Sequence, residues 1–265
     1  LVLFSLITVG YSANALGGAG GPLAVLIIAI VAAELGKAVS KETKVDILVT
    51  PLVTIFAGVG LSMLIAAPIG AAASQVGTLI MWATEQAPLV MGILVSVIVG
   101  VALTLPISSA AICAALGLTG LAGGAAVAGC CAQMVGFAVM SYKENGVGGL
   151  VSQGLGTSML QMPNILRNPR TWIPPTLAAA ITGPIATCLF HLEMNGPAVS
   201  SGMGTCGLVG QIGVYTGWIE SGKAVTAFDW IGLVLICFVL PAVLSTIFCE
   251  VLRKKGWIKE GDLKL

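Results

Sequence analysis

Residues 86–142 read QAPLVMGILVSVIVGVALTLPISSAAICAALGLTGLAGGAAVAGCCAQMVGFAVMSY and contain no charged side chain. A helix needs about 20 apolar residues to cross about 30 Å of hydrocarbon, so this stretch is long enough for two crossings. Charged residues are also missing from residues 1–33, 47–84 and 230–249. A transmembrane barrel would instead show short segments of polar and apolar alternation, which this sequence lacks. The pattern predicts an all-α polytopic membrane protein.

The overall composition points the same way. The 265 residues are 57% hydrophobic and 9% charged, and their mean hydropathy is +1.03. A soluble domain carries about 25% charged residues, and a chain of this size cannot bury so much apolar surface in its own core. These values exclude a soluble enzyme, a nucleic-acid-binding protein and a secreted disulfide scaffold. We therefore expect membrane lipid around the chain and no nucleic-acid partner.

The cysteines and the single histidine give no sign of metal or redox chemistry. The seven cysteines form no Cys-x-x-Cys pair and lie mostly inside apolar runs, where cysteine behaves as a small hydrophobic residue. One histidine, His191, provides too few nitrogen ligands for a histidine-rich metal site. We expect no metal and no cofactor.

The apolar runs divide the chain into expected helices within one transmembrane domain, residues 1–265. These helices cover residues 1–16 (partial), 23–39, 47–73, 89–116, 121–142, 172–192 and 228–252. Residues 74–88 have a mixed character that favours a helix lying along the membrane interface. Residues 1–16 are short for a full span and lack the basic start of a signal peptide, so we interpret them as the remainder of a longer N-terminal region.

The positions of lysine and arginine predict the orientation, because cytoplasmic loops are enriched in both. Lys37, Lys41 and Lys44 lie in one short connection, and four basic residues follow the last span. Both regions should be cytoplasmic, which makes residues 253–265 a short cytoplasmic tail. The number of expected spans between these two regions is odd, which would place the two regions on opposite sides of the membrane. Either residues 145–166 or 197–215 complete an extra crossing, or residues 74–88 span after all.

Two glycine-rich segments resemble neither lipid-facing helices nor free loops. They are residues 146–161, GVGGLVSQGLGTSMLQ, and residues 195–211, NGPAVSSGMGTCGLVGQ. Residues 152–160 align without gaps with residues 200–208 and share the pattern Ser-x-Gly-[Leu/Met]-Gly-Thr-x-x-Leu. Paired interruptions of this kind are typical of a transporter's binding site, and irregular backbone at membrane depth lines cavities or is buried in protein. We expect a helical bundle with two re-entrant hairpins that meet around a water-accessible site; close helix packing by small residues is the alternative.

The chemistry of the site follows from these residue types. Glycine lets a ligand approach the main chain, and threonine hydroxyls and free N–H groups at broken helix ends would face it. A carboxylate near a membrane segment is a functional candidate, although Glu193 could instead cap a helix at the water interface. We predict no catalytic residue and no metal ligand. The predicted substrate-binding residues are Ser152, Gly154, Gly156, Thr157, His191, Glu193, Asn195, Ser200, Gly202, Gly204 and Thr205.

A family resemblance rests on residues 162–175, MPNILRNPRTWIPP, and the apolar span that follows them. They resemble the Pro-x-x-x-x-Asn-Pro-x-x-x-x-Pro signature of phosphotransferase-system membrane subunits, the IIC components. Residues 195–213 look like the branch that includes the perfringolysin O regulator proteins. The resemblance implies a dimeric helical transporter in the bacterial plasma membrane, with two re-entrant hairpins around a sugar site. Phosphate would come from separate IIA and IIB proteins.

The sequence departs from the glucose-type members of that family. Their Gly-Ile-Thr-Glu hairpin is missing, and Glu193 is the candidate replacement for its glutamate. No phosphoryl-carrying residue is recognisable. The first hypothesis is therefore a sugar-translocating IIC component that binds a sugar or polyol, with Arg167 and Arg170 attracting phosphate or the IIB surface or extending to lipid headgroups. The alternatives are a IIC-like membrane sensor or regulator, and an ion-coupled transporter that uses His191 and Glu193.

Overall fold

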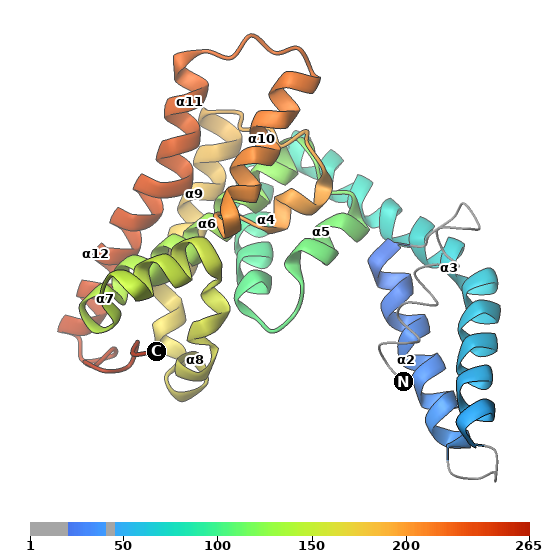
Figure 1. Ribbon diagram of the computed structural model, residues 1–265. Helices are drawn as coiled ribbons and strands as arrows, with labels where there is room; N and C mark the ends of the chain where they lie inside the picture. The colour runs from blue at the N-terminus through green and yellow to red at the C-terminus, as the bar shows by residue number, and fades with distance from the viewer. Residues whose placement is uncertain (1–20, 41–45) are drawn as a thin grey trace. The chain divides into compact units, whose positions relative to one another are not determined.

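The structure, a computed structural model, describes residues 21–40 and 46–265 and builds them from helices (Figure 1). Its only extended pairing within these ranges is an isolated bridge between Gly120 and Met194. Among the described residues, four helical stretches are long and apolar enough to cross a membrane, namely Leu48–Gln86, Gly120–Met140, Pro169–Leu189 and Ala227–Lys254. The predicted all-α membrane protein is confirmed; the partial helix expected at residues 1–16 lies outside the described residues.

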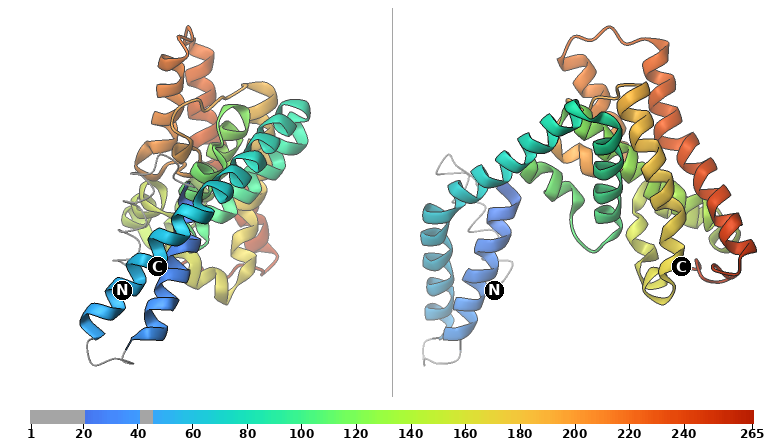
Figure 2. Two further views of the ribbon diagram at one scale, coloured as in Figure 1. Left: turned by 90° about the vertical axis from the view of Figure 1, so that its right-hand side faces the viewer. Right: turned by 180° about the vertical axis from the view of Figure 1, so that it is seen from behind.

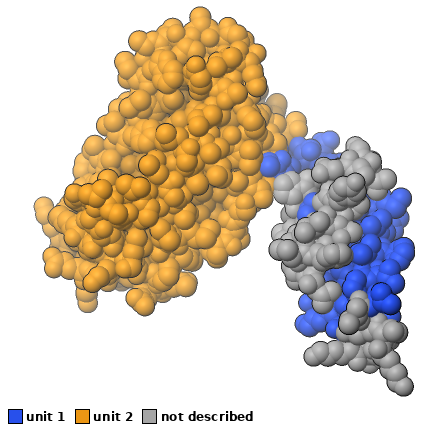
Figure 3. Space-filling model, viewed as in Figure 1, with its two compact units in different colours: residues 1–77, 114–116 blue, residues 78–113, 117–265 orange. Residues whose placement is uncertain are grey.

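The chain divides into two compact units (Figure 3). The first comprises residues 1–77 and 114–116, and the second residues 78–113 and 117–265. In the first unit, α2 (Gly21–Val39) packs against α3 (Asp46–Gln86) through Ala24, Ile28 and Ala66. Residues 74–86 are the continuation of α3 and not a separate helix. This stretch contains no proline, and Gly77 is its only glycine, so no residue in it ends the helix.

The second unit contains long helices interrupted by short π and 3₁₀ turns. In chain order its elements are α4 (Pro88–Thr104), α5 (Ser109–Leu116), whose last residues belong to the first unit, α6 (Gly120–Met140), α7 (Tyr142–Val151), η1 (Ser152–Gly156), η2 (Ser158–Gln161), α8 (Met162–Arg167), η3 (Pro169–Trp172), α9 (Ile173–Pro184), η4 (Ile185–Leu189), η5 (Ala198–Gly202), η6 (Cys206–Leu208), α10 (Val209–Glu220), α11 (Ala227–Val234), η7 (Leu235–Val239) and α12 (Leu240–Lys254).

Helix α6 is the centre of this unit, and every residue from 122 to 138 is buried. Its sequence is rich in Gly, Ala and Cys, and small residues allow neighbouring backbones to approach closely. At Gly129, an added Cβ would lie 1.9 Å from the carbonyl oxygen of Ser96 on α4. Helices α4 and α12 both pack against α6 and α9, and the view from behind in Figure 2 shows α4, α9 and α12 side by side.

The single span expected at residues 89–116 is wrong, because the chain breaks between α4 and α5. Leu105 is extended, with φ −67° and ψ 154°, because the residue before a proline is sterically excluded from the helical region; here that proline is Pro106. Ser108 then starts α5 by accepting a hydrogen bond from the Ala111 N–H at 3.1 Å. The other expected spans of this unit correspond to α6, to α9 with η4, and to the run from α11 to α12.

Two chain reversals pack against α6 from its two ends. The first hairpin (residues 142–167) leaves the C-terminal end of α6, runs through α7 and η1, and returns through η2 and α8. The second hairpin (residues 194–220) begins beside Gly120 at the N-terminal end of α6 and returns through α10. Its two limbs are in contact, because Gly196 and Gly213 pack against each other.

Candidate functional site

The two hairpins meet at a hydrogen bond between their glycine-rich motifs. The Thr205 hydroxyl donates to the Gly154 carbonyl oxygen at 2.5 Å, and Thr205 is fully buried. Gly154 is the third residue of the first motif, and Thr205 is the sixth residue of the second. The structure therefore brings two of the predicted site residues together across the internal repeat.

The first hairpin reverses at Thr157, which is extended with φ −160° and ψ 143°. Its hydroxyl accepts a hydrogen bond from the Met159 N–H at 3.1 Å, the bond by which a threonine N-cap starts a new helical turn. Before the reversal, the Ser152 hydroxyl donates to the Gly149 carbonyl at 3.2 Å. Gly156 is exposed, and an added Cβ there would meet no atom within 4 Å. Thr157 and Ser152 thus shape the tip, and Gly156 leaves main chain open at it.

In the second hairpin, Gly204 is required by geometry. Its φ of +53° is one that side-chain-bearing residues rarely adopt, and an added Cβ would lie 2.7 Å from the Cys130 Cβ on α6. The neighbouring residues are anchored to the rest of the unit. The Gly202 carbonyl accepts from the Ser109 hydroxyl at 2.7 Å, and Ser200 is buried against Gly213. This hairpin is therefore a fixed, tightly packed segment.

Strained backbone occurs around the same segment. Among the described residues, only His191 (φ +43°) and Leu208 (φ +59°) have a positive φ without being glycine. Such conformations cost on the order of 1–3 kcal/mol each, and they cluster at ligand sites and switches. Leu208 is the N-cap of α10, so the strain lies where the second hairpin turns back.

The structure places His191, Glu193 and Asn195 away from the hairpin contact. All three are exposed, and Asn195 donates to Glu193 Oε2 at 3.0 Å. They flank Met194, which bridges to Gly120 at the start of α6, whereas Thr205 contacts Met134. An α-helix rises about 1.5 Å per residue, so the two positions are about 20 Å apart along α6.

A buried polar cluster beside the hairpin contact was missed by the sequence analysis. We name it the polar cluster; its members are Thr104, Gln133, Ser158, Trp172 and Thr176. Gln133 Oε1 accepts from Trp172 Nε1 at 3.1 Å and from Thr104 at 3.3 Å, and Gln133 Nε2 donates to Thr176 at 3.1 Å. The hydroxyls of Thr104 and Ser158 share a bond of 2.9 Å.

The polar cluster is uncharged and is next to the residues of the hairpin contact in the sequence. Gln133 and Ser158 are fully buried. Ser158 follows the tip of the first hairpin, and Gln133 adjoins Met134, which contacts Thr205 at 3.6 Å. Amide, hydroxyl and indole groups can exchange hydrogen bonds with the hydroxyls of a neutral ligand. Gln133 is the one amide side chain in residues 121–142, and this was the signal that could have indicated the cluster.

The comparison with known families decides what kind of protein this is. The family model described as "Phosphotransferase system, EIIC" matches residues 3–265. The chain belongs to the EIIC family. No curated protein and no solved structure matches it. The family resemblance of residues 162–175 is confirmed, and this EIIC chain is a membrane component of a sugar-transporting phosphotransferase system.

In this EIIC chain the proline signature connects the first hairpin to α9. Pro163, Pro169 and Pro174 each lie at the start of a helical segment. The first N–H groups of a helix have no acceptor within it, so proline costs no hydrogen bond there. Asn168 caps η3 by accepting from the Arg170 N–H at 3.2 Å. The Arg170 guanidinium lies 5.0 Å from the centre of the Trp257 ring. The signature therefore sets the geometry of this connection.

Proposed function

We propose that this chain is the sugar-translocating IIC component of its phosphotransferase system and binds a sugar or polyol between the two hairpins. The observation that carries the proposal is the bond from Thr205 to Gly154, because it joins the two copies of the repeated motif beside the polar cluster. The groups near this contact are neutral donors and acceptors, which suit hydroxyls better than ions.

We propose further that both hairpins are re-entrant. The first starts at the C-terminal end of α6 and the second at its N-terminal end. A spanning helix has its two ends at opposite faces of the membrane, so hairpins that start there and meet between them would each enter the bilayer and return. Inverted, interrupted segments of this kind surround the substrate sites of other transporters. Non-α turns interrupt both hairpins, π and 3₁₀ in the first and 3₁₀ in the second, and they support this arrangement.

The proposed roles of the site residues follow from their positions. Gly154, Thr205 and the polar cluster contact the substrate hydroxyls. The remaining motif residues, Ser152, Gly156, Thr157, Ser200, Gly202 and Gly204, shape the two hairpins around it. His191, Glu193 and Asn195 lie at the mouth of the path, near the N-terminal end of α6.

The partners of the chain act, in this proposal, at the end where its basic residues gather. Eight of the 12 basic residues belong to the first hairpin, to η3 or to the C-terminal part of the chain, and they are Lys143, Arg167, Arg170, Arg253, Lys254, Lys255, Lys259 and Lys264. An excess of lysine and arginine marks the cytoplasmic side. Separate IIA and IIB phosphocarrier proteins would act there, on a homodimer in the bacterial plasma membrane.

Ligand binding by the purified chain tests the proposal. Thermal unfolding is measured in detergent with a panel of hexoses, hexitols and N-acetylhexosamines, because a ligand that binds only the folded state raises the Tm. We expect at least one sugar to stabilise the wild-type chain and to stabilise Thr205→Val less. We also expect that uptake of that sugar into vesicles requires a phosphodonor. Uptake driven by a proton gradient alone would contradict it.

A further inference from the structure

A short segment after α12 folds back onto the first hairpin. We name residues 256–265 the strap. It leaves α12 at Gly256, whose φ of +70° allows a sharp turn. Two apolar side chains of the strap are buried, Ile258 at 2% exposure and Leu263 at 0%, and they pack in one cluster with Phe137 of α6. The expected tail is therefore a docked element of the fold.

Side chains at the start of the first hairpin bind the main chain of the strap. Glu144 Oε2 accepts from the Leu263 N–H at 2.8 Å. Asn145 donates to the Leu263 carbonyl at 2.7 Å and accepts from the Leu265 N–H at 2.8 Å. Polar side chains that satisfy main-chain groups hold a segment in one register.

The returning limb of the hairpin binds the same part of the strap. Gln161 donates to the Leu263 carbonyl at 2.9 Å, and Asn164 donates to the Lys264 carbonyl at 2.9 Å. Gln161 also donates to Gln153 Oε1 at 2.9 Å. Gln153 immediately precedes Gly154, which accepts the bond from Thr205. A continuous chain of contacts therefore leads from the strap to the hairpin contact.

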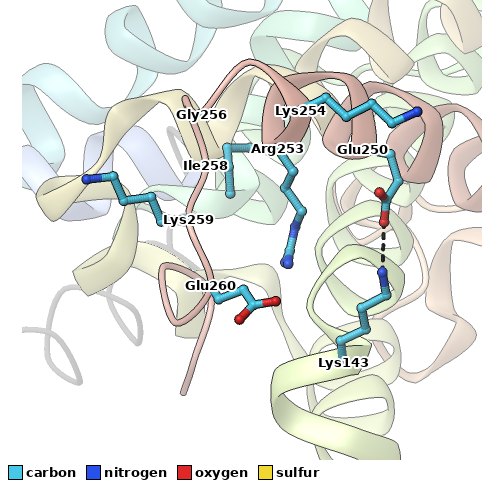
Figure 4. Close-up of a pocket in the computed structure, with 8 residues that line it drawn as sticks. All are labelled: Lys143, Glu250, Arg253, Lys254, Gly256, Ile258, Lys259 and Glu260. Carbon is cyan, nitrogen blue, oxygen red and sulfur yellow. Dashed lines mark hydrogen bonds and ion pairs between the residues drawn. The ribbon is translucent and has the colours of Figure 1, made fainter.

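The near half of the strap is attached to the connection that follows the first hairpin, because Asn168 donates to the Trp257 carbonyl at 2.9 Å and Ile258 is buried. A pocket of about 580 Å³ separates it from α7 (Figure 4), and the pocket is lined by residues of α7, α12 and the strap. Arg253 points into this space and pairs with Glu144 at 2.8 Å, and the ion pair of Lys143 with Glu250 crosses its edge. The bonds from the first hairpin to the main chain of the strap are at residues 263–265, so losing the anchor at Leu263 would free the far end of the strap from that hairpin.

We propose that the strap is a regulatory latch on the proposed sugar site. Docked, it holds the first hairpin closed against α12 at the basic end of the second unit. Undocked about Gly256, it frees the hairpin and opens a path from Gly154 to that side of the membrane. The importance of this opening for transport rests on the proposed function; the latch itself depends only on the contacts of the strap.

Hydrogen exchange of the full-length chain tests the latch with a matched pair of variants. Leu263→Asp places a charge at the buried anchor, whereas Leu265→Asp places the same charge at a side chain that is 50% exposed. We expect Leu263→Asp to raise amide exchange in residues 142–167 at least tenfold, while α6 and the second hairpin stay at wild-type rates. Leu265→Asp should match the wild type throughout.

A milder pair, Leu263→Ala and Leu265→Ala, serves if the charged variant fails to fold, and a rise of about threefold in the first hairpin is then expected. Faster exchange confined to the strap, with the hairpin unchanged, would overturn the latch. Equal exchange in the hairpin for both members of a pair would overturn it too.

Side-specific labelling gives an independent readout. Ser158→Cys places a thiol at a fully buried position of the first hairpin, and Cys188 and Cys206 are replaced by serine because they are not buried. An impermeant maleimide should label Ser158→Cys slowly with the wild-type strap and at least five times faster with Leu263→Asp, from the basic side only. Equal rates would overturn the proposal. Neither assay contains a sugar. The latch can therefore be rejected while the proposed sugar binding is retained, and sugar binding can be rejected while the latch is retained.

Discussion

Thr205 and Gly154 are 51 residues apart in the sequence, and the hydroxyl of the first donates to the carbonyl of the second at 2.5 Å. The bond links the tips of two hairpins that approach α6 from its opposite ends. Each hairpin is also anchored elsewhere, the second to Ser109 through Gly202 and the first to the strap through Gln161. A shift of either hairpin must therefore break the bond between them or move the other hairpin with it.

Removing the Thr205 hydroxyl tests the value of this contact. Thr205→Val keeps the shape of the side chain and leaves the Gly154 carbonyl without its partner. A net hydrogen bond is worth about 0.5–1.5 kcal/mol, and a buried group left unpaired costs about 1–3 kcal/mol. We expect a lower Tm and at least a fivefold weaker affinity for the stabilising sugar. Thr216→Val, on α10 of the same hairpin, removes a bond to Ile212 within its own helix and should leave the affinity unchanged.

Two glycines with the same backbone angle separate steric contact from conformational strain. Gly204 and Gly207 both have φ +53°, but an added Cβ would lie 2.7 Å from Cys130 at Gly204 and no nearer than 3.8 Å to any atom at Gly207. Both alanine variants incur about 1–2 kcal/mol for the left-handed conformation. Gly204→Ala should cost about 1–3 kcal/mol more, because it overpacks the contact with α6. Thermal unfolding of both variants measures the difference; equal losses would contradict the tight packing of Gly204.

The polar cluster predicts a loss of binding without loss of the fold. Gln133→Met removes the amide from the centre of the cluster while conserving volume, and Thr104 and Ser158 keep their mutual bond. We expect the affinity for the stabilising sugar, measured by calorimetry, to fall at least tenfold. Ser245→Ala is the control: among the described residues, its hydroxyl is the buried side-chain group without a hydrogen-bond partner, so its removal should be neutral. Full affinity in Gln133→Met would exclude the cluster from the site.

Substitution of Glu193 tests whether this residue lies at the entrance to the binding site and not in the site itself. Its carboxylate is exposed and pairs with Asn195, about 20 Å along α6 from the contact with Thr205. Glu193→Gln should therefore slow sugar uptake by vesicles while changing the affinity of the purified chain less than twofold. Asn195→Asp, which replaces the donor of that pair, should slow uptake similarly. A tenfold loss of affinity in Glu193→Gln would place this carboxylate in the binding site.

The sequence predicted the parts of the fold that depend on local composition. The apolar runs located α6, α9 and the run from α11 to α12, since each contains an apolar stretch long enough to cross a membrane. The break at Pro106 was missed, because proline is tolerated in membrane helices when neighbours satisfy the freed carbonyls. The continuity of α3 through Ser74 was missed because mixed polarity was interpreted as a separate interfacial helix.

The site was only partly predictable for a different reason. Repetition of the motif indicated that Gly154 and Thr205 belong together, but it could not give their pairing, which depends on packing against α6. Gln133 was missed although it is the one amide in its segment, because only the fold brings its partners Trp172, Thr104 and Thr176 to it. The strap was missed because most of its polar partners bind main-chain atoms, and its two buried side chains, Ile258 and Leu263, form no recognisable pattern.

The most direct test of a sugar site between the hairpins is ligand protection at both tips. Leu155→Cys reports on the first hairpin, and the native Cys206 reports on the second, each examined alone with Cys188 replaced by serine. The account predicts that the stabilising sugar slows maleimide labelling of both thiols with the same half-maximal concentration, whereas Gly222→Cys, in the turn after α10, is unaffected. If the sugar binds and either tip keeps its full labelling rate, the substrate does not lie between the two hairpins.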